Sequence, residues 1–183
     1  MTPSDYLDRA GLAAPLEQMA NFVADYRRVL QTAALPADIA SLYQYRVPEL
    51  GDNGACSLPD LLADAPYDLA ATLGGVQEAT TARLAALHAL VQAVARDTGC
   101  GWLGIYQARE LAGGPALVKL AYTGKPSRAE FPLTAEFAAH SNNSTVGLSG
   151  KARLIASVDA YLAEGGAYYT CDAAVQSEAC LPL

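Results

Sequence analysis

The stretch GWLGIYQARELAGGPALVKLAY, residues 101–122, decides the fold, because the spacing of hydrophobic residues changes there from a helical period to a strand period. Residues 101–107 and 116–122 are typical of strands, and the Gly-Gly-Pro sequence at 113–115 indicates a turn between them. We therefore expect an antiparallel hairpin at the centre of the chain.

A long helix is predicted immediately before this hairpin, over residues 76–98. Apolar side chains recur at helical spacing from Leu84 to Val94, and Gly99 is a natural stop signal. His88 lies beside the apolar stripe, and we interpret it as a half-buried structural histidine.

Further strands and a short helix are expected after the hairpin, with a mixed segment at 134–150. The predicted strands are 129–133, 152–157 and 178–183, and the predicted helix is 158–165. Together these elements predict an α+β fold, an antiparallel sheet flanked by helices.

Residues 1–75 are predicted to form a helical arm and an irregular linker. The spacing of apolar residues favours a helix over 16–30 and a shorter helix over 37–45. Prolines and glycines punctuate residues 48–75, so this segment is the candidate linker. We expect two parts, the arm at 1–75 and a domain at 76–183.

The charge and composition exclude several classes of protein. The chain has 183 residues, enough for one domain with a modest appendage, and 52% of them are hydrophobic. A net charge of −7 and a pI near 4.7 argue against nucleic acids and anionic membranes as partners. No apolar run could span a bilayer, and the first residues do not resemble a targeting signal. We expect a cytoplasmic protein.

The cysteines and histidines do not have the spacing of a metal site. There is no CxxC pair and no cluster with either His88 or His140, so we expect no metal and no cofactor. Four free thiols are expected: Cys56, Cys100, Cys171 and Cys180.

Three motifs in residues 76–183 resemble one family. They are Gly101–Tyr106, with its W-x-G-I-Y pattern, the Thr-Gly-Lys-Pro turn after Tyr122, and the C-terminal segment Cys171–Leu183 with Cys-Asp and Ser-Glu pairs. Their order resembles the GAF domain, and in particular the free methionine-(R)-sulfoxide reductase branch.

The resemblance implies a set of site residues. Cys171 would be the attacking thiol and Glu178 the acid, with Asp172 and Ser177 as ligand-binding residues. Trp102 and Tyr106 would wall an apolar pocket, since residues four apart on a strand share a face. The alternatives stay open: core packing for the two aromatic residues, and ordinary turn or solvent-exposed roles for Asp172 and Glu178.

The departures from the branch affect the expected function. Arg128 and Asn143 stand at the two upstream positions where the branch has cysteines, so neither can resolve a sulfenic acid on Cys171. We expect a GAF-type small-molecule binding or sensory module that has lost reductase chemistry. The alternative is a reductase that uses Cys171 with an external thiol. A third hypothesis is a helical arm on a GAF dimer without ligand, and a homodimer through the N-terminal helices is the expected partner arrangement.

The resemblance also implies an empty position in the sheet. In that branch a central strand, with two substrate-binding aspartates, lies between the counterparts of 101–107 and 178–183, and it would begin after Leu183. We expect a domain truncated at its C-terminus, with exposed strand edges. The alternatives are that another segment or chain fills the position, or that the gene product is degenerate.

Overall fold

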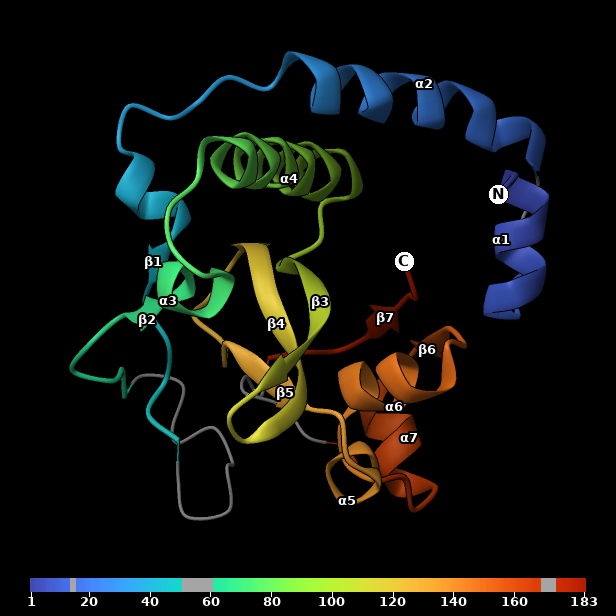
Figure 1. Cartoon of the computed structure of the whole chain (residues 1–183). Helices are drawn as coiled ribbons and strands as arrows, with labels where there is room; N and C mark the ends of the chain where they lie inside the picture. The colour runs from blue at the N-terminus through green and yellow to red at the C-terminus, as the bar shows by residue number, and fades with distance from the viewer. Residues whose placement is uncertain (14–15, 51–60, 169–173) are drawn as a thin grey trace.

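The computed structural model describes residues 1–13, 16–50, 61–168 and 174–183, and it has an α+β architecture (Figure 1). The first elements are α1 (Pro3–Ala10), α2 (Leu16–Thr32), the 3-10 helix η1 (Ile39–Leu42), β1 (Gln44–Tyr45), β2 (Tyr67–Asp68) and α3 (Leu69–Leu73). The later elements are α4 (Glu78–Thr98), β3 (Leu103–Leu111), β4 (Gly114–Thr123), β5 (Glu130–Pro132), α5 (Ala135–Ala138), α6 (Asn142–Ser149), β6 (Arg153–Ile155), α7 (Val158–Ala163) and β7 (Glu178–Cys180).

The predicted hairpin is confirmed, with longer strands than expected. β3 and β4 pair antiparallel from Leu103↔Thr123 to Leu111↔Gly114, so the turn consists of Ala112 and Gly113 alone. Gly114 has a φ of 102°, a conformation that glycine adopts without strain. The strands extend into the expected loop because continued pairing satisfies backbone groups that a long loop would leave to solvent.

Helices cover both faces of the sheet, whose strand order is β3-β4-β5. Val118 of β4 packs with Leu84 of α4 in the main core. The preceding residue, Leu117, faces the opposite way, and its side chain lies within 3.4 Å of a Cβ built on Gly147 of α6. Side chains alternate along a strand, so α4 covers one face and α6 the other. The core cluster comprises Leu42, Tyr43, Leu69, Leu84, Ala85 and Val118.

The N-terminal elements are attached to this core. Figure 1 shows α2 running along the outer side of α4, where the Tyr26 hydroxyl donates to Asp97 at 3.3 Å. The carbonyl of Ala10, at the end of α1, accepts from the backbone N–H of Ala152 at 2.8 Å. Leu69 of the expected linker is fully buried. The domain boundary at residue 76 therefore stays a prediction.

Neither β3 nor β7 has a strand on its second side among the described residues. β3 is the first strand of its three-stranded sheet, and β7 pairs only with β6, through Arg153↔Cys180 to Ile155↔Glu178. The two strand edges that the resemblance places beside the empty position have no second partner strand among the described residues, and the empty position itself stays a prediction.

Several expected elements differ from the structure. The helix over 37–45 is wrong: η1 is a single 3-10 turn capped by Asp38, and Gln44–Tyr45 then pairs with β2. The strand over 178–183 ends at Cys180. The mixed segment 134–150 holds two helices, α5 and α6, whose first turns are capped by Thr134 and Ser141. Short helices of this kind depend on caps more than on hydrophobic periodicity.

Every helix among the described residues is too short or too polar to span a lipid bilayer.

Candidate functional site

Tyr106, a predicted ligand-binding residue, lies on β3 with its ring folded back over Gly104. A Cβ built on Gly104 would lie 2.7 Å from the Tyr106 ring, so only glycine leaves space for that ring. The ring also meets Phe131 of β5 edge-on, with 5.4 Å between the centroids. Burial raises the pKa of Tyr106 above its ordinary value. The hydroxyl is therefore neutral, and it bonds to Ser127.

Trp102 precedes β3 and is partly exposed. A Cβ built on Gly124 would lie 2.6 Å from the Trp102 Cβ, so the open end of the hairpin is closely packed at this pair. Gly124 has a φ of 107°, which also favours glycine there. A ligand role for Trp102 and Tyr106 stays a prediction.

Glu178 lies on β7, where two polar side chains hold its carboxylate. Asn142 Nδ2, from the first turn of α6, donates to Glu178 Oε2 at 2.6 Å. The Tyr168 hydroxyl also bonds to Glu178; burial, and then this carboxylate, raise the pKa of Tyr168. Ser177 is exposed beside it. Cys171 and Asp172 lie outside the described residues.

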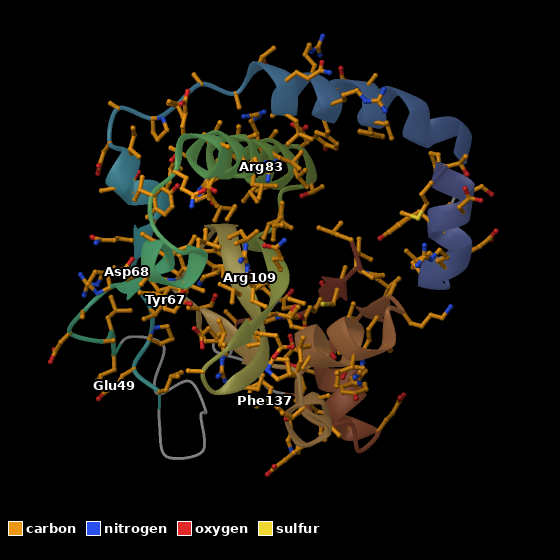
Figure 2. All side chains as sticks on the ribbon, viewed as in Figure 1. Glu49, Tyr67, Asp68, Arg83, Arg109 and Phe137 are labelled. Carbon is orange, nitrogen blue, oxygen red and sulfur yellow. The ribbon has the colours of Figure 1, made fainter. Side chains whose placement is uncertain are left out.

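Arg128 and Asn143 occupy the two positions at which the resemblance expects cysteines, and the side chains of both make specific contacts. The Arg128 side chain is buried, its Nε donates to the Glu130 carbonyl at 2.5 Å, and its guanidinium lies 4.6 Å from the centre of the Phe137 ring. Phe137 lies on α5 (Figure 2). Asn143 Oδ1 accepts from Cys180 Sγ at 3.0 Å. Burial raises the pKa of Cys180 to about 12, so this thiol is a poor nucleophile.

The sequence analysis missed Lys119, a lysine that is 1% exposed. Its ammonium donates to the Ser127 carbonyl at 2.6 Å and to Ser127 Oγ at 3.1 Å. It also lies over two tyrosine rings, 4.9 Å from the centre of Tyr45 and 4.3 Å from that of Tyr122. No carboxylate pairs with it in the described part of the chain. Burial without a counter-charge lowers the pKa of Lys119 to about 7.

His88 lies on α4 and is half-buried, as expected. It lies beside an irregularity in the pairing of the two hairpin strands. The register skips Leu120, because Ile105 pairs with Ala121 and Tyr106 pairs with Lys119. His88 bonds to the backbone of Leu120, and burial lowers the pKa of the imidazole. Its Nε2 is buried and has no hydrogen-bond partner among the described residues.

A cavity of about 190 Å³ at the edge of β4 is lined by both Lys119 and His88, and we call it the Lys119 cavity. Its wall combines apolar surface with a few polar groups, an arrangement typical of small-molecule sites. Trp102, Tyr106 and Glu178 are not among the residues of its wall. The residues that line the cavity are Tyr45, Arg46, His88, Lys119, Leu120, Ala121, Tyr122, Gly124 and Pro126.

The chemistry available in the Lys119 cavity is that of an amine, an imidazole and a guanidinium. No group of three or more His, Cys, Asp or Glu side chains in the described residues could hold a metal ion. One sequence signal could have identified Lys119: it shares a strand face with Leu117, and Val118 and Leu120 beside it are apolar as well. A lysine inside a strand that is apolar on both faces is a candidate for burial.

No protein-family model matches the chain, and no curated protein or solved structure matches it significantly.

Proposed function

We propose that the chain is a GAF-like small-molecule binding or sensory module without reductase chemistry, and that its ligand occupies the Lys119 cavity. The observation that carries the proposal is the wall of this cavity. It contains a buried amine with no carboxylate partner and an imidazole nitrogen with no partner among the described residues. Buried polar groups are normally satisfied, so the unpartnered imidazole nitrogen of His88 beside a cavity favours a ligand that satisfies it.

The GAF-like assignment has support from the order of the elements. A long helix precedes an antiparallel hairpin, and short helices and strands follow, as the resemblance implies. The loss of reductase chemistry has support from Arg128 and Asn143, which carry packing and hydrogen-bonding roles where the branch has cysteines.

Binding can be tested with the full chain by amide NMR and thermal shift against a panel of small carbonyl compounds and organic acids. We expect at least one compound to shift the signals of the Lys119 cavity. Lys119→Met should abolish these shifts, whereas Lys151→Met, at an exposed lysine beside β6, should retain them. A panel in which no compound moves these signals would contradict the proposal.

The alternative is a free methionine-(R)-sulfoxide reductase with Cys171 as the attacking thiol and Glu178 as the acid. The observation in its favour is the fixed carboxylate of Glu178, which accepts from Asn142. A turnover assay with free methionine sulfoxide and a thiol reductant separates the two functions. We expect turnover far below the ordinary enzyme value of roughly 10 per second, and turnover near that value, lost in Cys171→Ser, would favour the enzyme.

A homodimer through the N-terminal helices is the proposed partner arrangement. Its support is exposed apolar surface on α2, where Phe22 is 56% exposed and Leu30 is 40% exposed. Size-exclusion chromatography with light scattering tests it. We expect a dimer that Phe22→Glu converts to a monomer, and a monomeric wild-type chain would contradict the arrangement.

A further inference from the structure

Lys119 differs from the other lysines in its readiness to react. Lys125 and Lys151 are exposed, whereas Lys119 is buried against tyrosine rings without a carboxylate. With a pKa of about 7, a large fraction of its side chains carries a free lone pair at neutral pH. An ordinary lysine with a pKa of about 10.4 is almost wholly protonated there. A neutral primary amine is the nucleophile that forms Schiff bases with carbonyl compounds.

The size of the Lys119 cavity limits the ligand. A volume of about 190 Å³ corresponds to about six water molecules at ~30 Å³ each. Lys119 belongs to the wall of this cavity, and so do Tyr45 and Tyr122, whose rings lie 4.9 Å and 4.3 Å from Nζ. A carbonyl compound of about six non-hydrogen atoms therefore fits.

Two further groups of the wall indicate the ligand's charge. Arg46 is exposed and carries a permanent positive charge, and a guanidinium binds a carboxylate through two parallel hydrogen bonds. His88 contributes a nitrogen with no partner among the described residues, which can accept a hydrogen bond from a hydroxyl group. The described part of the wall contains no acidic residue that would repel an anion.

We propose that the Lys119 cavity binds a small 2-oxo acid, with Lys119 Nζ forming an imine to its carbonyl carbon and Arg46 pairing with its carboxylate. This proposal rests on the proposed binding function and names the ligand class for the same cavity.

The reaction needs no oxidant or reductant. The Nζ lone pair adds to the carbonyl carbon, and a carbinolamine forms whose hydroxyl can donate to His88 Nε2. The carbon–oxygen bond then breaks, and the oxygen leaves as water with the two amine protons. The product is a neutral imine, and addition of water reverses the reaction.

Access to the amine requires a local movement. Ser127 accepts from Nζ through both its carbonyl and its hydroxyl oxygen, and Gly124 and Pro126 of the same turn belong to the cavity wall. Displacement of this turn frees the amine, so imine formation should be slower than diffusion-limited binding and should follow a single slow phase.

Reductive trapping tests the proposal on the full chain. The protein is incubated at pH 7 with pyruvate and sodium cyanoborohydride, which converts an imine to a stable secondary amine, and the modified lysine is found by peptide mass spectrometry. We expect modification at Lys119 at least about tenfold above that at the exposed residues Lys125 and Lys151, because an amine with a pKa of about 7 is neutral in a far larger fraction of molecules than an ordinary lysine. Equal modification of all three lysines would overturn the proposal.

Two variants provide matched controls. Arg46→Gln, at an exposed position, should reduce modification by pyruvate about tenfold, because it removes one charge-assisted contact with the carboxylate. The same variant should leave modification by propanal unchanged. Lys119→Arg retains a cation and should lose the adduct; circular dichroism checks that it is folded. If pyruvate shifts the NMR signals of the cavity but forms no adduct, the proposed imine formation is overturned and the proposed binding function is retained. The absence of both shifts and adduct, for pyruvate and for every other compound of the panel, would overturn both.

Discussion

The two faces of the β3-β4-β5 sheet differ in what they bury. On the α4 side, Val118 packs among apolar residues such as Leu84 and Leu69. On the opposite side, Lys119 is as buried as Val118, although it can ionise. Burying apolar surface is favourable, and burying a group that can ionise costs free energy. The α4 side therefore supplies apolar stabilisation, and Lys119 is a buried ionisable group on the other side, while the Lys119 cavity is also lined by His88 of α4.

The largest expected effect concerns the α4 side. Leu84 is 2% exposed, and Leu84→Ala leaves a cavity that the helix and sheet cannot fill, at a cost of about 2–5 kcal/mol in the free energy of unfolding. Arg83→Ala, at the exposed neighbouring position on α4 (Figure 2), should change it by no more than about 0.5 kcal/mol. Urea denaturation measures both, and equal effects would show that α4 does not face the sheet through Leu84.

The sequence predicted this side of the molecule better than the other. The helix at 76–98 and the hairpin follow from periodicity, which reports one apolar face, and the structure confirms both. The caps of α5 and α6 were the available signal for the helices at 134–150, and periodicity over such short segments does not reveal them. η1 followed by β1 was missed because tertiary pairing with β2, more than 20 residues away, overrides local helical spacing.

The site could be predicted only in part. Tyr106 and Glu178 were predicted as site residues, and each has a specific polar partner in the structure. Neither lines the Lys119 cavity, so their functional roles remain predictions. Lys119 was not identified, because a lysine in a hairpin is ordinarily solvated and its burial depends on Tyr45 from a distant segment. Cys171 and Asp172 lie outside the described residues, so their roles remain predictions.

The next effect concerns the packing of Tyr106. Gly104→Ala would bring a Cβ to 2.7 Å from the Tyr106 ring, so the ring must move away from Phe131. We expect a loss of about 1–3 kcal/mol in the free energy of unfolding. Gly101→Ala is the control, because nothing lies within 4 Å of its Cβ position. Should the two variants prove equally stable, the Tyr106 ring does not cover Gly104 in solution.

A smaller effect, in the pH dependence of stability, sharpens the contrast between Val118 and Lys119. The folded-state pKa of Lys119 is about 7, below the ordinary value of about 10.4, so the unfolded chain binds more protons at this site between these values. The free energy of unfolding therefore rises with pH through Lys119, by about 1–2 kcal/mol from pH 7 to pH 8.5. Above pH 8.5 the raised pKa of Cys180 acts in the opposite direction, which sets the upper limit.

The measurement is urea denaturation of the wild type and Lys119→Met across this pH range. The variant should lack the slope due to Lys119, and the difference between the two slopes cancels the other titrating groups. Lys151→Met, at an exposed lysine, should keep the wild-type slope. A wild-type slope that persists in Lys119→Met would mean that Lys119 is solvated and that the two faces do not differ in this way.

The smallest expected effect concerns Ser144 of α6, on the same side as Lys119. Its side chain is fully buried, and its Oγ has no hydrogen-bond partner in the part of the chain that the structure describes. Removing an unsatisfied hydroxyl removes its desolvation cost, so Ser144→Ala should leave stability unchanged or raise it by up to about 1 kcal/mol. Ser141→Ala is the matched control three residues earlier, because Ser141 Oγ caps α6 by accepting from the Ser144 N–H at 3.3 Å. Its loss should cost about 1 kcal/mol.

Opposite signs for these two serine-to-alanine changes, measured by urea denaturation, would show that this side holds a buried polar group that the fold does not need. A loss of stability in Ser144→Ala as large as that in Ser141→Ala would mean that the Ser144 hydroxyl has a partner in solution.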